Sequence, residues 1–150
     1  MLFPANEWSE VWNNFQHVAV AYALTVSIGW ESERQGQVAG VRTFPIVGMA
    51  SCGYLLVLGA QPDTASQSRL LQGLITGIGF IGGGAILKEG ATVTGTATAA
   101  SVWNAGVIGA AVAMNHYGIA ITLALLNLFT LRALLPLKRW LDRNINASNK

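Results

Sequence analysis

Few residues in this chain carry the side chains that chemistry requires. Only 11% of its 150 residues are charged, and the two histidines, His17 and His116, stand far apart, with no cysteine or acidic residue at metal-ligand spacing. The single Cys52 lies in an apolar stretch and has no second cysteine to pair with. No serine, histidine and aspartate set and no pair of carboxylates lies inside the apolar segments. The sequence therefore predicts no metal site, no cofactor and no enzymatic activity.

The acidic and basic residues that border the apolar segments are the first candidates for a site. Glu31 and Arg42 flank a short polar stretch between two such segments, where an ionisable group is costly unless it is paired. We therefore expect an ion pair between Glu31 and Arg42 that closes the two segments at this end. Arg69 opens the third apolar segment.

Hydroxyl and amide side chains gather at the start of the fourth apolar segment. Thr98, Ser101 and, less squarely, Asn104 follow at three-residue spacing and so share one face of a helix. Two interpretations stay open: this face lines a polar site, or the hydroxyls bond back to carbonyls of their own helix. Trp103 lies near the same end, and its ring is expected to pack against the glycine-rich third segment.

The glycine-rich stretch GLITGIGFIGGGAIL contains the letters of a dinucleotide-binding fingerprint. That fingerprint also needs a preceding strand and an acidic residue about 20 positions on, where this chain reads TGTATAAS, so we reject nucleotide binding. Glycine in a membrane helix instead lets two backbones approach closely. Gly73 and Gly77, and likewise Gly79 and Gly83, have the four-residue spacing that favours such close helix packing. The triplet at 82–84 is more glycine than packing requires, so tight packing and a backbone break that lines a polar site both stay open.

The polar residues and glycines named above lie in or beside five apolar segments, which must hold them in place once folded. Between Leu70 and Leu87 no residue is charged, and about 18 uncharged residues suffice to cross a bilayer as a helix. The 52% of hydrophobic residues and the mean hydropathy of +0.44 are typical of an integral membrane protein. We predict a single all-α membrane domain over residues 1–150, a bundle of about five transmembrane helices at residues 15–30, 43–60, 69–87, 96–115 and 118–137.

The lysines and arginines predict the orientation, because basic residues near span ends resist translocation. With the N-terminus outside and the C-terminus inside, eight basic residues fall on the cytoplasmic side and only Arg69 falls outside. The basic stretch at 138–150 is then expected to be a short polar tail that anchors the last span. The net charge of +2 is too small to indicate a nucleic-acid partner.

Four short motifs follow one another along the chain. They are GWE at 29–31, AGVRT at 39–43, GIGF at 77–80 preceded by Arg69, and VTG at 93–95 followed by TAASVW at 98–103. In this order they resemble the motifs of the MgtC/SapB family of bacterial inner-membrane proteins. Ser32 stands where members of that family usually carry an arginine. The chain stops at Lys150, so it resembles the short, SapB-like type that lacks a soluble C-terminal domain.

The resemblance implies a protein of the bacterial inner membrane that is linked to growth under magnesium limitation. Longer members act by restraining other membrane machinery, notably the ATP synthase, so regulation through membrane contacts is our first hypothesis. A small ion transporter or channel is the alternative. We also expect a homo-oligomer, most simply a dimer, because five short helices bury little surface and the glycine and alanine faces are more than one internal contact uses.

The polar residues of these motifs are expected to form one site, shaped by the glycines. Most of them lie toward the predicted cytoplasmic half, which favours a cup that opens inward over a path across the ~30 Å hydrocarbon core. The expected polar residues are Glu31, Arg42, Thr43, Arg69, Thr98, Ser101, Trp103 and Asn104, and the glycines are Gly73, Gly77, Gly79, Gly82, Gly83, Gly84 and Gly95.

Overall fold

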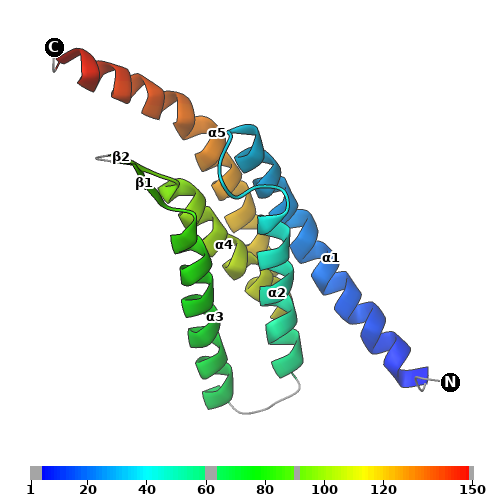
Figure 1. Cartoon of the computed structure of the whole chain (residues 1–150). Helices are drawn as coiled ribbons and strands as arrows, with labels where there is room; N and C mark the ends of the chain where they lie inside the picture. The colour runs from blue at the N-terminus through cyan, green and yellow to red at the C-terminus, as the bar shows by residue number, and fades with distance from the viewer. Residues whose placement is uncertain (1–4, 60–63, 90–91, 149–150) are drawn as a thin grey trace.

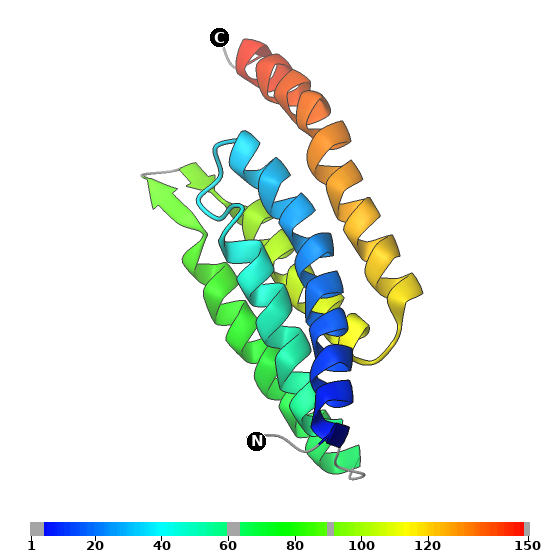
Figure 2. The ribbon, with the colours of Figure 1, turned by 90° about the vertical axis from the view of Figure 1, so that its right-hand side faces the viewer.

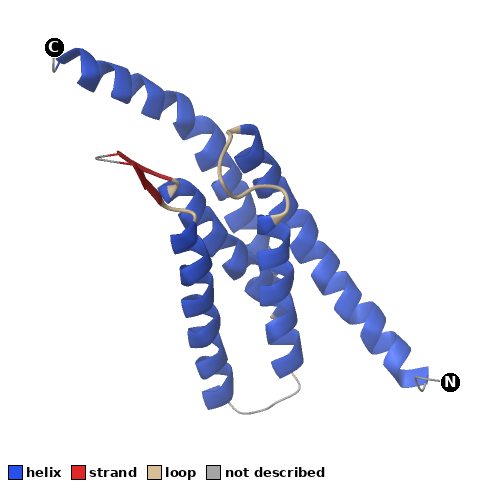
Figure 3. Ribbon diagram, in the orientation of Figure 1, coloured by secondary structure: helices blue, strands red, loops and turns tan. Residues whose placement is uncertain are grey.

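The part of the chain that the structure describes folds into five helices and a short two-stranded hairpin (Figure 1, Figure 3). The structure is a computed structural model and describes residues 5–59, 64–89 and 92–148. The hairpin is antiparallel and pairs the strand after the third helix with the strand before the fourth. In chain order, the elements are α1 (Ala5–Arg34), α2 (Thr43–Leu58), α3 (Thr64–Gly84), β1 (Leu87–Glu89), β2 (Thr92–Thr94), α4 (Thr96–Ala113) and α5 (Tyr117–Ser148).

Among the described residues, two helices are long and apolar enough to cross a membrane. They are Thr96–Ala113, which is all of α4, and Tyr117–Leu137, the first two thirds of α5. The apolar α2 has 16 residues, or about 24 Å of helix, which is shorter than a ~30 Å hydrocarbon core. The all-helical prediction agrees with this architecture, whereas five membrane spans and the N-out, C-in orientation stay predictions.

Two helices are longer than the spans predicted for them. α1 has 30 residues and begins at Ala5 rather than near residue 15, because no glycine or proline interrupts residues 5–28. α5 continues through Pro136 to Ser148, so the stretch expected to be a polar tail is helical at 138–148. Leucine, lysine and arginine are good helix formers, and they dominate the residues just after the proline.

The glycine triplet at 82–84 forms the last turn of α3 and not a bend inside it. The turn is closed by tightened bonds, from the Ala85 N–H to the Gly82 carbonyl at 3.0 Å and from the Ile86 N–H to the Gly83 carbonyl at 3.1 Å. Glycine is a poor helix former, so the chain leaves the helix here and enters β1. The span predicted at 69–87 in fact begins at 64 and ends at 84.

α4 lies at the centre of the bundle and contacts the other four helices. Its closest approach is to α2, where a Cβ on Gly109 would collide with the backbone of Gly48. α3 packs on α4 as predicted, through Gly82, where an added Cβ would lie 3.1 Å from the Ala99 carbonyl oxygen. These contacts between backbones require glycine, because any side chain would hold the helices apart.

Most of the α3 glycines do not take part in this packing. A Cβ added at any of five of them would meet nothing within 4 Å, so their surfaces are open. The two pairs with the spacing for close helix approach therefore point away from the α4 seam. These open glycines are Gly73, Gly77, Gly79, Gly83 and Gly84.

Successive helices run in opposite directions, which collects the connections at two ends of the bundle (Figure 1, Figure 2). One end holds the loop at 35–42, the β1–β2 hairpin and the starts of α2 and α4, and we call it the hairpin end. The opposite end holds the turn at 114–116 and the start of α1. The residues predicted to face the cytoplasm thus share the hairpin end, except those of the α5 extension, which continues beyond it.

Candidate functional site

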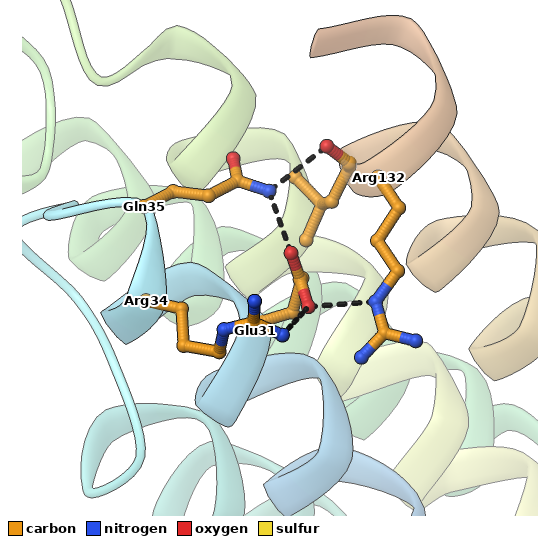
Figure 4. A network of polar contacts seen from close by, with 5 residues as sticks. Glu31, Arg34, Gln35 and Arg132 are labelled. Atoms are coloured by element: carbon orange, nitrogen blue, oxygen red, sulfur yellow. Dashed lines mark hydrogen bonds and ion pairs between the residues drawn. The ribbon is translucent and has the colours of Figure 1, made fainter.

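A network of polar side chains centred on Glu31 joins α1 to α5 near the hairpin end (Figure 4). The Nε–H of Arg132 donates to Oε2 of Glu31 at 2.7 Å, and Nη1 of Arg34 lies 3.6 Å from the same oxygen. The Nε2 amide of Gln35 donates to Oε1 of Glu31 at 3.1 Å and to the carbonyl of Leu131 at 2.9 Å. Both carboxylate oxygens are therefore partnered.

The partners explain how Glu31 can be buried, with 6% of its surface exposed, and still carry a charge. Glu31 lies just beyond the predicted span at 15–30. The hydrogen bond from Arg132, followed by that from Gln35, lowers the pKa of its carboxyl below the ordinary glutamate value, against the opposing effect of burial. The carboxylate is thus ionised at neutral pH.

The expected pair between Glu31 and Arg42 does not form, and this corrects the sequence-based prediction. Arg42 is exposed at the start of α2, and Glu31 is instead bonded to Arg132. The loop between them is folded tightly, since a Cβ on Gly29 would lie 2.9 Å from the Gly40 carbonyl oxygen. This close contact fixes the path of the loop independently of Arg42.

Two neighbours of Glu31 hold that loop in place. The hydroxyl of Ser32 donates to the Ala39 carbonyl at 2.6 Å, and the Val41 N–H donates to Oε2 of Glu33 at 2.9 Å. Ser32 is the residue that departs from the usual arginine of the family pattern. Its short side chain is buried here, with 1% of the residue exposed.

Below the loop, a cavity of about 320 Å³ opens at the hairpin end. The buried hydroxyl of Thr98 donates to Oε1 of Gln37 at 2.7 Å and so ties α4 to the loop across its wall. Gly95 precedes α4 here as its N-cap residue; its φ of +81° suits glycine, and it has no side chain to cap the helix. Most of the lining surface of this cavity is apolar, and we call it the polar cup for the hydroxyl and amide groups on its wall. It is lined by Gln35, Gln37, Val93, Thr94, Gly95, Thr96, Ala97, Thr98, Thr130, Leu131, Leu134 and Leu135.

Further along α4 than the cup, polar side chains join α4 to α5. The hydroxyl of Ser101 donates to Oδ1 of Asn127 at 2.9 Å, while Nδ2 of Asn127 is buried without a partner. The Nδ2 amide of Asn104 donates to the Leu123 carbonyl at 3.4 Å. The hydroxyls of Thr98 and Ser101 therefore bond to other elements and not back to their own helix.

The remaining predicted residues do not gather at the cup. Arg69 lies in the first turns of α3, toward the opposite end of the bundle, and lines a groove between α2 and α3 together with Gly73 and Gly77. Trp103 lines a small cavity on the α3–α4 seam with Gly106, which agrees with packing against the glycine-rich helix. Thr43 is the first residue of α2.

Sequence reasoning did not single out four residues that the structure brings together here. Arg132 is the one charged residue and Asn127 the one amide residue of the mainly apolar first part of α5, residues 117–137. A polar side chain isolated in an apolar segment is a sign of a functional role, and the sequence offered that sign for both residues. Gln35 and Gln37 had none, because a glutamine in a polar loop is ordinary. Only the fold places them against α4 and α5.

Comparison with known proteins shows the family to which the chain belongs. A model described as the MgtC family matches residues 18–140. The chain is 32% identical over 103 residues to Protein MgtC of Brucella abortus, covering 66% of this chain and 43% of that protein. It is 33% identical over 116 residues to YhiD of Escherichia coli K12, which is described as a candidate magnesium transporter. The match covers 69% of this chain and 54% of YhiD.

A third relative is similar along nearly its whole length. Protein SrpB of Synechococcus elongatus is 32% identical over 160 residues, which covers 96% of this chain and 86% of SrpB. The chain thus spans about half the length of the MgtC and YhiD relatives and most of SrpB. No solved structure matches the chain.

Proposed function

Since this chain belongs to the MgtC family, we propose that it is a regulatory protein of the bacterial inner membrane that acts when magnesium is limiting. It acts through contacts at the hairpin end, which faces the cytoplasm, with another membrane protein such as the ATP synthase. The polar cup is the contact site.

The observation that carries this proposal is that the side-chain hydrogen bonds from α4 to its neighbours all lie in the half of α4 nearer the hairpin end. The bond from Thr98 to Gln37 lies at the cup, and the bonds from Ser101 to Asn127 and from Asn104 to the Leu123 carbonyl follow within the next two turns. Beyond Asn104, α4 buries only apolar or glycine surface, and Gly109 contacts the backbone of α2 directly. An ion would find no continuous row of polar groups there, which supports binding over conduction.

An ion transporter is the second candidate, and one observation favours it. The relative YhiD of Escherichia coli carries the description of a candidate magnesium transporter. In this alternative the cup would be the cytoplasmic mouth of a path that a second conformation completes.

A flux measurement separates the two candidates. The purified protein is reconstituted in sealed vesicles, and the movement of magnesium, potassium and protons is followed against empty vesicles. We expect no flux that depends on the protein. Flux that Thr98→Val abolishes, while Thr76→Val leaves it intact, would establish the transporter instead; Thr76 is a matched control because its hydroxyl only bonds back to the Gln72 carbonyl.

A crosslinking measurement tests the contact itself. A photo-reactive residue in place of Thr94, at the rim of the cup, is expected to capture another inner-membrane protein in cells grown at low magnesium. The same residue in place of Val57, which is 80% exposed toward the opposite end of α2, should capture only lipid. Equal adducts at both positions would contradict a contact site at the cup.

A further inference from the structure

A groove between α2 and α3 lies at the opposite side of the bundle from the cup. Both helices pack on α4 but touch each other little, and Figure 1 shows them as two separate rods. The space between them has a volume of about 450 Å³, within the range of ligand-binding cavities. Its wall on α3 is recessed because Gly73 and Gly77 carry no side chain. The groove is therefore a built feature of the helix surfaces and not a gap in their packing.

The groove is mainly apolar, but it offers two hydrogen-bond donors that have no partner among the described residues. Arg69 is exposed at its edge and makes no ion pair with any described residue. The hydroxyl of Ser51 is buried in the wall, with 1% of the residue exposed, and has no hydrogen-bond partner. A buried hydroxyl without a partner is destabilising, which points to a ligand that supplies an acceptor.

These two donors lie at a similar depth. Ser51 comes seven residues before the end of α2, and Arg69 comes five residues after the start of α3. At ~1.5 Å per residue each lies about one and a half to two helical turns inside the same end of the bundle. A ligand held here carries an anion beside Arg69, an acceptor oxygen near Ser51 and an apolar body along the glycines.

We propose that the α2–α3 groove binds one acyl chain of an anionic phospholipid. The phosphate pairs with Arg69, an ester carbonyl accepts the hydroxyl of Ser51, and the chain lies along Gly73 and Gly77. A lateral apolar groove in a membrane protein is filled by lipid or by protein, because water gains no hydrogen bonds there. The positive charge of Arg69 attracts an anionic headgroup, so this groove is expected to select negatively charged lipids and not to contact all lipids equally.

A second copy of the chain fits this groove less well. In a two-fold dimer the same surface meets itself about an axis along the membrane normal, so the two copies of Arg69 would face each other at equal depth. Two like charges near the membrane repel, whereas a phosphate neutralises the one that is present. Charge complementarity thus favours the lipid.

The test uses the intact protein in nanodiscs of equimolar phosphatidylglycerol and phosphatidylcholine. Native mass spectrometry counts the lipids that stay bound after release from the discs. We expect one bound phospholipid, with phosphatidylglycerol preferred about fivefold, the ratio that ~1 kcal/mol per basic residue corresponds to. Arg69→Gln should bring this preference close to one, while Lys88→Gln, an exposed cation of β1 at the other end, should leave it unchanged.

Filling the groove gives a second, independent readout. Gly77→Leu should remove the bound lipid, because its Cβ would meet nothing within 4 Å and the added side chain can extend into the recess. Gly53→Leu is the matched control on α2, since it is equally open but does not line the groove. Equal retention of both lipids by the native protein, or no loss in Gly77→Leu, would overturn the proposal. The proposal would also be overturned if Gly77→Leu dissociated a protein dimer and released no lipid. A failure here would leave the proposed contact at the cup unaffected.

Discussion

Nε of Arg132 lies 2.7 Å from Oε2 of Glu31, so one charged hydrogen bond joins α5 to α1 across 101 residues of sequence. Glu31 is buried and Arg132 is largely exposed, so the pair stands at the edge of the bundle with the carboxylate facing inward. The bond fixes the position of the last helix, which forms one side of the polar cup.

A double-mutant cycle measures how strongly these two residues are coupled. Arg132→Gln leaves a buried carboxylate with weaker partners, so we expect it to lower the free energy of unfolding by about 1–3 kcal/mol. Glu31→Gln with Arg132→Gln should cost less than the sum of the single changes. The measurement is denaturant unfolding in detergent. The cycle of Glu31 with Arg42→Gln is the control and should be additive; coupling there would restore the pair that the sequence suggested.

The lowered pKa of Glu31 makes the stability depend on pH in a defined direction. The carboxyl gives up its proton more readily in the folded protein than in the unfolded chain, so its contribution is fully present above the unfolded value of about 4.3. That contribution should be lost as the pH falls from there through the lower, folded value. Glu31→Gln should remove this component of the thermal unfolding profile between pH 7 and pH 3. Identical profiles for the two proteins would contradict the assignment.

The contact between Gly48 and Gly109 should not tolerate a single methyl group. An added Cβ at Gly109 would collide with the α2 backbone, so Gly109→Ala is expected to destabilise the fold by about 1–3 kcal/mol. Gly53→Ala adds the same methyl group where nothing lies within 4 Å and should instead be neutral or stabilising by up to ~1 kcal/mol. Thermal unfolding in one detergent compares them. Equal effects would mean that the two helices are not in close contact.

The orientation is tested with reporter fusions. A reporter active only in the periplasm should be silent when fused after Arg143, because the hairpin end and the α5 extension are expected to face the cytoplasm. The same reporter inserted after His116, at the opposite end, should be active. The reverse pattern would invert the topology and place the cup outside.

Two of the open glycines of α3, Gly79 and Gly83, are expected to form the interface of a homodimer. Gly79 and Gly83 meet nothing within the chain, and Phe80 beside them is 86% exposed. Gly83→Leu should shift the protein from dimer to monomer in light scattering, whereas Gly53→Leu should not. One chain per particle for the native protein in several mild detergents would rule the dimer out.

The sequence by itself determined the local features of this protein. Apolar runs and the breakers between them specify helices at nearly the predicted places, because backbone hydrogen bonds close within each segment. The predicted helix ends were wrong at two places: residues 5–14 and 138–148 continue α1 and α5, since nothing in them breaks a helix. The motif residues also marked the hairpin end as the polar one.

Only the tertiary structure decided which residues meet. Glu31 had a plausible partner 11 positions away in Arg42, yet it bonds to Arg132, because the tight loop after α1 and the return of α5 along α1 bring that guanidinium to the carboxylate. A pairing between distant residues depends on where whole helices pack, and the spacing of residues along one chain does not contain that information.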